Sequence, residues 1–142
     1  MSSDQSAQNC PFCNPPEDRI FLRNDRVLGL WDGYPVSPGH ALLVPRRHVP
    51  TWFEATAAEQ AALMSAINDA KAVIEHHHRP DGYNIGINCG VAAGQTVFHT
   101  HIHLIPRFRG DVGDPRGGVR HVIAGKANYL RSTDAKHNSR AK

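Results

Sequence analysis

The sequence predicts an α+β domain in which one long helix packs on a mainly antiparallel sheet of five strands. Short runs of β-branched, aromatic and other apolar residues, bounded by turn formers, occur before and after a single long segment with helical periodicity. Strands and helices do not alternate along the chain, which argues against parallel βαβ units. The 142 residues are enough for one domain with a hydrophobic core.

Three strands are expected before the helix. Residues 20–22 and 27–31 are apolar runs separated by a short turn, which predicts a pair of adjacent strands. Residues 32–40 are rich in glycine, proline and serine and therefore predict a loop. The third strand covers residues 41–44 and is closed by Pro45.

Two capping-box patterns then follow in succession, Thr51 with Glu54 and Thr56 with Glu59. The second predicts the start of the long helix. Its apolar stripe recurs at alternating gaps of four and three residues, at Leu63, Ile67, Ala70, Ile74 and His77. The segment Arg79-Pro-Asp-Gly82 predicts the end of the helix.

The remaining strands are expected after the helix. Apolar residues alternate with polar or small ones over residues 83–87, which predicts a half-buried strand. A second strand is expected at residues 98–104. Residues 110–118 are rich in glycine and aspartate and predict a loop, and residues 121–123 are expected to add a short extended piece.

We expect a flexible N-terminus at residues 1–9, the folded domain at residues 10–130 and a flexible basic tail at residues 131–142. The formal charge of +3 comes from that tail, so charge argues against nucleic acid as a partner. Neither a membrane span nor a signal peptide is evident, and the three cysteines are an odd number. We therefore expect a cytoplasmic protein without membrane contact.

Three histidines mark the strand at residues 98–104. His99, His101 and His103 occupy alternate positions, so on a strand their rings would point to one side, about 7 Å apart. A strand does not need this pattern for stability. Imidazole is the side chain suited to chemistry near neutral pH, which predicts a functional site here.

The pattern Cys10-Pro-Phe-Cys13 has two possible functions. A redox dithiol requires a helix N-terminus after a strand, and no strand-like segment precedes Cys10. As half of a zinc site, the pair needs two more ligands, which His48 and one histidine of the triad could supply.

The triad allows two kinds of chemistry. It could bind a zinc ion that activates water, or one histidine could attack phosphorus and form a covalent phosphoramidate. Asn88 and the segment Gly94-Gln-Thr96 offer amide, hydroxyl and backbone donors suited to phosphate oxygens. The triad strand contains no acidic residue for a hard metal, so a phosphate substrate handled without Mg²⁺ fits better.

Three motifs together resemble the histidine triad (HIT) superfamily of nucleotide hydrolases and transferases. Residues 94–107 resemble its signature, in which histidines alternate with apolar residues, although Thr100 is polar where an apolar residue is usual. Residues 38–48, Pro-Gly-His-Ala-Leu-Leu-Val-Pro-Arg-Arg-His, are similar to its second hallmark. Residues 10–13 resemble the zinc-binding start of many bacterial members. The resemblance implies a HIT-like fold over residues 10–130.

The resemblance also implies roles for site residues. His101 would be the nucleophile, with its other ring nitrogen held by a backbone carbonyl, and His103 would contact the phosphate. A structural zinc would be held by Cys10, Cys13, His48 and His99. The phosphate would be bound by Asn88, Gly94, Gln95 and Thr96. Asp32 would contact the ribose, and apolar residues near Leu30 and Trp31 would wall the base pocket. No organic cofactor is expected, and a homodimer with a continuous sheet is implied.

We therefore expect an enzyme acting through nucleotidylated His101, with dinucleoside polyphosphates as substrates. Hydrolysis of nucleoside phosphoramidates is the alternative. Two rival classes are a nucleotide-binding sensor whose turnover is incidental and a zinc-water hydrolase that uses the triad as ligands. The sequence assigns no function to His40, to residues 76–78 or to the C-terminal tail.

Overall fold

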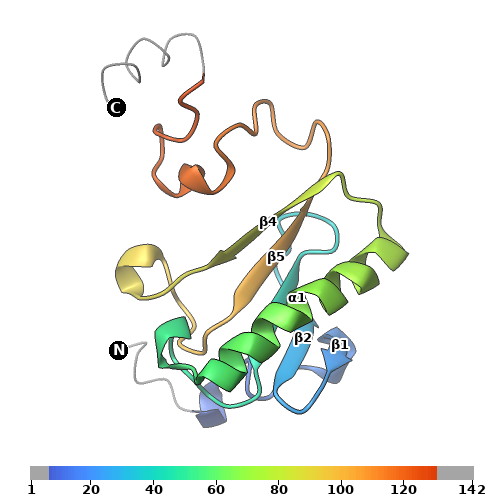
Figure 1. The fold of residues 1–142 in the computed structure, drawn as a ribbon, viewed down its shortest axis with the longest axis vertical. Coiled ribbons are helices and arrows are strands. Elements are labelled where there is room, and N and C mark those ends of the chain that lie inside the picture. The colour runs from blue at the N-terminus through green and yellow to red at the C-terminus, as the bar shows by residue number, and fades with distance from the viewer. Residues whose placement is uncertain (1–6, 131–142) are drawn as a thin grey trace. The chain divides into compact units, whose positions relative to one another are not determined.

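The computed structural model describes residues 7–130, and its five strands form one antiparallel sheet (Figure 1). The strands are β1 (Ile20–Arg23), β2 (Val27–Trp31), β3 (Ala41–Pro45), β4 (Gly82–Ile87) and β5 (Ile102–Arg107). Their order across the sheet is β1-β2-β3-β5-β4, so β1 and β4 are the edge strands. The α+β class and the five-stranded antiparallel sheet predicted from the sequence are confirmed.

The long helix α1 (Ala57–His77) begins where the second capping box predicts. The Thr56 hydroxyl accepts a hydrogen bond from the Glu59 amide at 3.1 Å, and the Glu59 carboxylate accepts one from the Thr56 amide at 2.8 Å. The Arg47 guanidinium donates to both Glu59 oxygens, at 2.8 and 2.9 Å. The Arg47 hydrogen bonds are the largest cause that lowers the pKa of Glu59 to about 2. The start of α1 is therefore anchored to the segment after β3.

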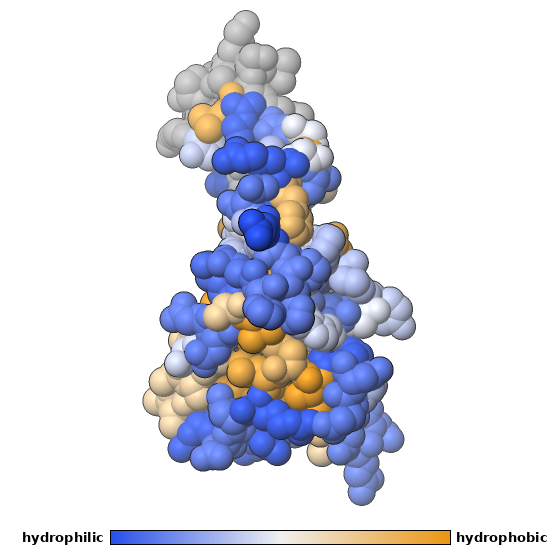
Figure 2. Space-filling view, turned by 90° about the vertical axis from the view of Figure 1, so that its right-hand side faces the viewer, coloured by the Kyte–Doolittle hydropathy of each residue, from blue (hydrophilic) through white to orange (hydrophobic). Residues whose placement is uncertain are grey.

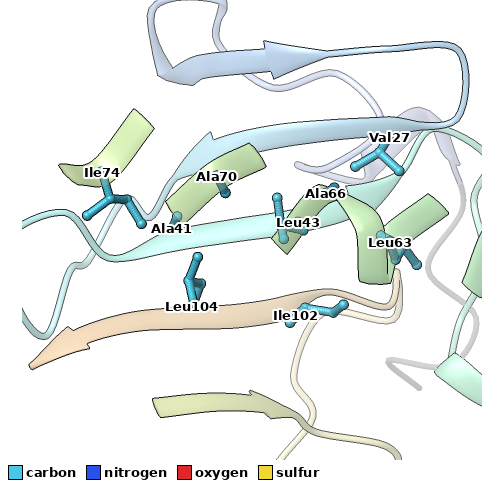
Figure 3. Close-up of a cluster of buried hydrophobic side chains, with 9 residues drawn as sticks. All are labelled: Val27, Ala41, Leu43, Leu63, Ala66, Ala70, Ile74, Ile102 and Leu104. Atoms are coloured by element: carbon cyan, nitrogen blue, oxygen red, sulfur yellow. The ribbon is translucent and has the colours of Figure 1, made fainter. Parts of the chain in front are cut away.

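Apolar side chains fill both faces of the sheet. Between the sheet and α1 lies one buried cluster (Figure 3), made of Val27, Ala41, Leu43, Leu63, Ala66, Ala70, Ile74, Ile102 and Leu104. The opposite face carries a second buried cluster, made of Cys10, Phe12, Leu28, Leu30, Leu42 and Val44. Alternate residues of β2 and β3 point to opposite faces, so both strands are buried on both sides. The second cluster holds the N-terminal segment against the sheet.

The strand that carries the histidines is shorter than the sequence predicts. It begins only at Ile102, so His99 and His101 precede it and His103 alone lies within it. The Thr100 amide donates at 2.7 Å to a carbonyl of the segment after β3 rather than to a neighbouring strand. The three histidines therefore do not share one face of a strand, and each ring is oriented by its own contacts.

Short 3-10 helices occur between the main elements, at Ala7–Asn9, Glu17–Arg19, Trp52–Glu54, Val91–Ala93 and Gly118–Val122. The last of these corrects the extended piece expected at residues 121–123. Gly117 precedes it with a φ of 99°, a backbone conformation that favours glycine. No strand in the described part of the chain pairs with this segment, so its β-branched residues have no ladder to join.

The chain divides into two compact units, the first ending at Arg107 and the second beginning at Phe108. Within the second unit, the Arg116 guanidinium donates to the Asp114 carboxylate at 3.0 Å. The domain end expected at residue 130 stays a prediction. The terminal segments expected to be flexible lie outside the described residues, apart from Ala7–Asn9.

On the face shown in Figure 2 the surface is mainly hydrophilic, and hydrophobic residues gather in a patch in the lower part of the view with hydrophilic residues around it. Among the helices of residues 7–130, none has the length and hydropathy needed to cross a membrane.

Candidate functional site

Four side chains that commonly bind metals converge from three separate segments. Cys10 and Cys13 come from the N-terminal segment, His48 follows β3, and His99 precedes β5. His99 Nδ1 lies 3.4 Å from each cysteine sulfur and 3.2 Å from His48 Nδ1. All four ligand atoms lie within 4.8 Å of one another. These four residues, the Cys/His cluster, could hold a metal ion.

The Cys/His cluster fits a tetrahedral ion with two sulfur and two nitrogen ligands. In a tetrahedron, metal–ligand bonds of about 2.1 Å to nitrogen and about 2.3 Å to sulfur place two nitrogens, or a nitrogen and a sulfur, about 3.4 to 3.6 Å apart. The corresponding distances in the Cys/His cluster are 3.2 to 3.4 Å. His99 Nε2–H donates to the Pro45 carbonyl at 2.7 Å, so the Nδ1 lone pair faces the cluster. Burial is the largest cause that lowers the pKa of His99 to about 4, which keeps the ring neutral at pH 7. Four protein ligands leave no open position, as in structural zinc sites.

His101 has the opposite tautomer. Its Nδ1–H donates to the His99 carbonyl at 2.9 Å, because a carbonyl oxygen can only accept. Nε2 therefore keeps a free lone pair. The residue is 8% exposed, and burial lowers the pKa of His101 below its usual value. The Phe12 ring, from between the two cysteines, contacts the His101 ring edge-on with 4.9 Å between centroids. The backbone contact expected for His101 is thus present.

A pocket of about 360 Å³ opens beside His101. Six of its lining residues were expected from the sequence: Asp32, Asn88, Gly94, Thr96, His101 and His103. The others are Pro11, Phe12, Arg19, Gly33, Tyr34, Leu42 and Val97. Phe12 and Leu42 belong to the second buried cluster, so the pocket lies on the face of the sheet opposite α1. A neutral imidazole with a free nitrogen therefore meets a cavity lined by amide, hydroxyl and backbone groups.

Comparison with known proteins identifies the family. The model of the HIT domain matches residues 15–110 of this chain, a region that contains all five strands, α1 and the three histidines. The chain belongs to the HIT family. The family and the fold expected from the sequence motifs are therefore confirmed.

Three members of the HIT family are similar over most of this chain. AP-4-A phosphorylase of Mycobacterium tuberculosis is 35% identical over 111 residues, which are 78% of this chain and 57% of that protein. The asymmetrical bis(5'-nucleosyl)-tetraphosphatase of Schizosaccharomyces pombe is 36% identical over 100 residues, which are 70% and 55%. The crystal structure of a Zn-bound histidine triad family protein from Mycobacterium smegmatis has a TM-score of 0.67 at 32% identity and covers 95% of this chain and 99% of that one. The chain thus spans just over half the length of the two curated enzymes.

Three residues that the HIT resemblance linked to the ligand do not line the pocket: Gln95, Leu30 and Trp31. Leu30 is fully buried in the second cluster. The Gln95 side chain accepts from the Gly90 amide at 2.8 Å and donates to the Pro50 carbonyl at 2.6 Å, so it braces the loop and does not line the pocket. Trp31 packs on the α1 side of the sheet, stacked on Phe21 with 4.2 Å between ring centroids.

The pocket of this HIT protein is also lined by three residues to which the sequence motifs gave no role: Phe12, Arg19 and Tyr34. Arg19 Nε donates to the Trp31 carbonyl at 2.9 Å, and Tyr34 is 91% exposed. Phe12 could have been found from its position between Cys10 and Cys13, because a site that fixes both cysteines also fixes the residue between them close by. No local pattern marks the other two residues. Arg19 ends the 3-10 helix before β1, and Tyr34 lies two residues after Asp32 in the loop that follows β2.

Proposed function

We propose that this HIT protein is a nucleotide hydrolase or nucleotidyl transferase that acts through a covalent nucleotidyl-His101 intermediate. The observation that carries the proposal is the His101 ring, whose Nδ1–H is bonded to the His99 carbonyl and which lines the pocket. A buried, neutral imidazole with a free nitrogen suits a nucleophile that works near neutral pH.

In the first step, His101 Nε2 attacks a phosphorus atom of the substrate. The P–N bond forms as the P–O bond to the leaving nucleotide breaks, and that electron pair passes to the leaving oxygen. Positive charge develops on the imidazole, where the Nδ1–H bond to the His99 carbonyl stabilises it. In the second step, water attacks the same phosphorus, the P–N bond breaks, the ring regains its electron pair, and a proton passes to solvent. Another acceptor in place of water gives transfer.

The other predicted pocket residues offer different chemical groups and are proposed to contact different parts of the substrate. Asn88, Gly94 and Thr96 offer a side-chain amide, a backbone amide and a hydroxyl to phosphate oxygens. His103 lines the pocket beside His101, with 5.1 Å between ring centroids, and is proposed to contact the same phosphate. Asp32 can accept hydrogen bonds from ribose hydroxyls. The proposed role of Gln95 is limited to its backbone.

Dinucleoside polyphosphates are the proposed substrates, because two relatives at 35% and 36% identity are named for AP-4-A and for bis(5'-nucleosyl) tetraphosphate. Nucleoside phosphoramidates are the alternative, since an attack on phosphorus by His101 can expel an amine as well as a phosphate. The two substrate classes are separated by direct assay.

We further propose that the Cys/His cluster holds a structural zinc ion. The donor set and spacing support zinc, as does the Zn-bound relative. Such an ion would cross-link the N-terminal segment to the segments on either side of the pocket. It would leave His101 free for its proposed role, which disfavours a zinc-water mechanism.

A homodimer that continues the sheet is also proposed. β4 is an edge strand with unpaired backbone groups, and its Ile85 side chain is 46% exposed. An edge strand with an exposed apolar residue suits pairing with a second copy.

The test is a panel of dinucleoside polyphosphates, nucleoside phosphoramidates and nucleotide sugars, read by release of the mononucleotide. His101→Ala should abolish turnover of every substrate, and mass spectrometry of the acid-quenched parent should find a nucleotidyl adduct on His101. His76→Ala, at the exposed end of α1, is the matched control and should turn over at the parent rate.

Turnover by His101→Ala at the parent rate would refute the mechanism. Tight nucleotide binding by the parent without turnover of any substrate would instead favour a nucleotide sensor. Loss of bound zinc in His101→Ala would favour the zinc-water mechanism.

A further inference from the structure

His40 is buried beside the pocket, and the proposed reaction does not use it. It ends the loop between β2 and β3, and 4% of its surface is exposed. Its Nε2 lies 3.0 Å from Nδ1 of His103 and 3.3 Å from Oδ2 of Asp32, two residues that line the pocket. His40 does not line the pocket itself, so it can influence a bound ligand only through these neighbours.

A backbone hydrogen bond fixes the tautomer of His40. The Val36 N–H donates to His40 Nδ1 at 3.1 Å, so Nδ1 must present a lone pair. A neutral imidazole with a lone pair on Nδ1 carries its proton on Nε2. Burial lowers the pKa of His40 and so favours the neutral ring. His40 therefore points an N–H at His103.

That N–H fixes the tautomer of His103 in turn. The His40 Nε2–H can be accepted at 3.0 Å only if His103 Nδ1 presents a lone pair. The His103 proton then lies on Nε2, on the other side of the ring. The Asp32 carboxylate can only accept, so its contact with the same N–H leaves this assignment unchanged.

We propose that His40 is a positioning residue that holds His103 as the Nε2–H tautomer, so that His103 donates a hydrogen bond to a phosphate oxygen in the pocket. The opposite tautomer would aim a lone pair at the phosphate and repel it. The identity of the ligand rests on the proposed function, whereas the tautomer can be measured without turnover.

A metal ion is the rival explanation for this group of residues. Asp32, His40 and His103 offer ligand atoms within 4.8 Å of one another, and two histidines with a carboxylate can bind divalent metals. Binding through His40 Nε2 would place the ring proton on Nδ1, where it would face the Val36 N–H donor at 3.1 Å. The backbone therefore favours the hydrogen-bonded chain over a metal site.

The test records ring ¹⁵N–¹H correlation spectra of histidine-labelled protein, with the His103 signals assigned by their loss in His103→Gln. The parent should show His103 as the Nε2–H tautomer. His40→Leu should convert it to a mixture of tautomers and lower kcat about tenfold, the effect expected for one hydrogen bond, with little change in KM. His40→Gln, whose amide can donate from the same place, should restore both the tautomer and most of kcat.

His76→Gln, on the exposed end of α1, is the matched control: it should remove only the His76 signals and leave the His103 signals and the rate unchanged. An Nδ1–H tautomer for His103 in the parent would overturn the proposal, even if His40→Leu failed to fold. An unchanged His103 spectrum in folded His40→Leu would also overturn it. A second zinc ion per chain that is lost with His40→Gln would establish the metal site instead. Turnover by His101→Ala would overturn the proposed function while leaving the tautomer result in place.

Discussion

Metal binding by the Cys/His cluster should weaken at least about tenfold for each unit by which the pH is lowered near neutrality. Burial is the largest cause that raises the pKa of the Cys13 thiol to about 11, followed by the Cys10 thiol beside it. Cysteine thiols are ordinarily protonated below about pH 8, and metals bind thiolates. His99, with a pKa of about 4, has no proton to release.

Binding therefore releases the Cys13 proton. Each released proton changes the affinity about tenfold per pH unit, or about 1.4 kcal/mol. Competition between the protein and a chromophoric zinc chelator, measured at several values between about pH 7 and pH 8, gives the slope directly. Calorimetry in two buffers with different ionisation enthalpies counts the protons independently.

Cys13→Ser is the control for the proton count. It removes the thiol with the raised pKa, so the affinity should fall overall and its pH dependence should become weaker by about tenfold per unit. A parent affinity that does not change with pH would refute the reasoning, because it would mean that the thiols do not give up protons to a metal at this cluster.

Three further perturbations test the fold. The pKa of Glu59 is lowered to about 2, chiefly by its hydrogen bonds to Arg47. The ionised carboxylate should therefore stabilise the fold fully above about pH 4.5, and this stabilisation should be lost as the pH falls towards 2. In denaturant titrations, the free energy of unfolding of Glu59→Gln should fall less on acidification than that of the parent. Among the described residues, the Thr100 hydroxyl is buried without a hydrogen-bond partner, so Thr100→Val should raise the free energy of unfolding by about 1 kcal/mol. Ile85→Lys on the β4 edge should convert the proposed dimer to monomers in sedimentation experiments, whereas Met64→Lys on α1 should not. A parent that is already monomeric would contradict the proposed dimer.

Much of the fold follows from local sequence. The capping box at Thr56 and Glu59 fixes the start of α1 through contacts three residues apart, and these contacts are present in the structure. The order β1-β2-β3-β5-β4 depends on pairings between distant segments, for which the sequence carries no local signal. The 3-10 helix at Gly118–Val122 was missed because β-branched residues suggest a strand even where no partner strand exists.

The candidate site could likewise be predicted only in part from local sequence. Spacing alone placed three imidazoles together but put them on one strand face, whereas His99 and His101 precede β5. The residues alone suggested that His48 and one histidine of the triad join the two cysteines, and only the family resemblance identified that histidine as His99. No local pattern marks Arg19, which ends the 3-10 helix before β1 and lines the pocket.

The backbone, rather than the histidine spacing, differentiates the three rings. His99 donates from Nε2 to the Pro45 carbonyl, which turns its Nδ1 lone pair towards the cysteines. His101 donates from Nδ1 to the His99 carbonyl, which leaves Nε2 as its free nitrogen. For His103 the partner is a side chain whose own tautomer is set by a backbone N–H. Identical side chains thus acquire different chemistry from main-chain groups, and a substitution that moves this backbone should impair the site even when every histidine remains.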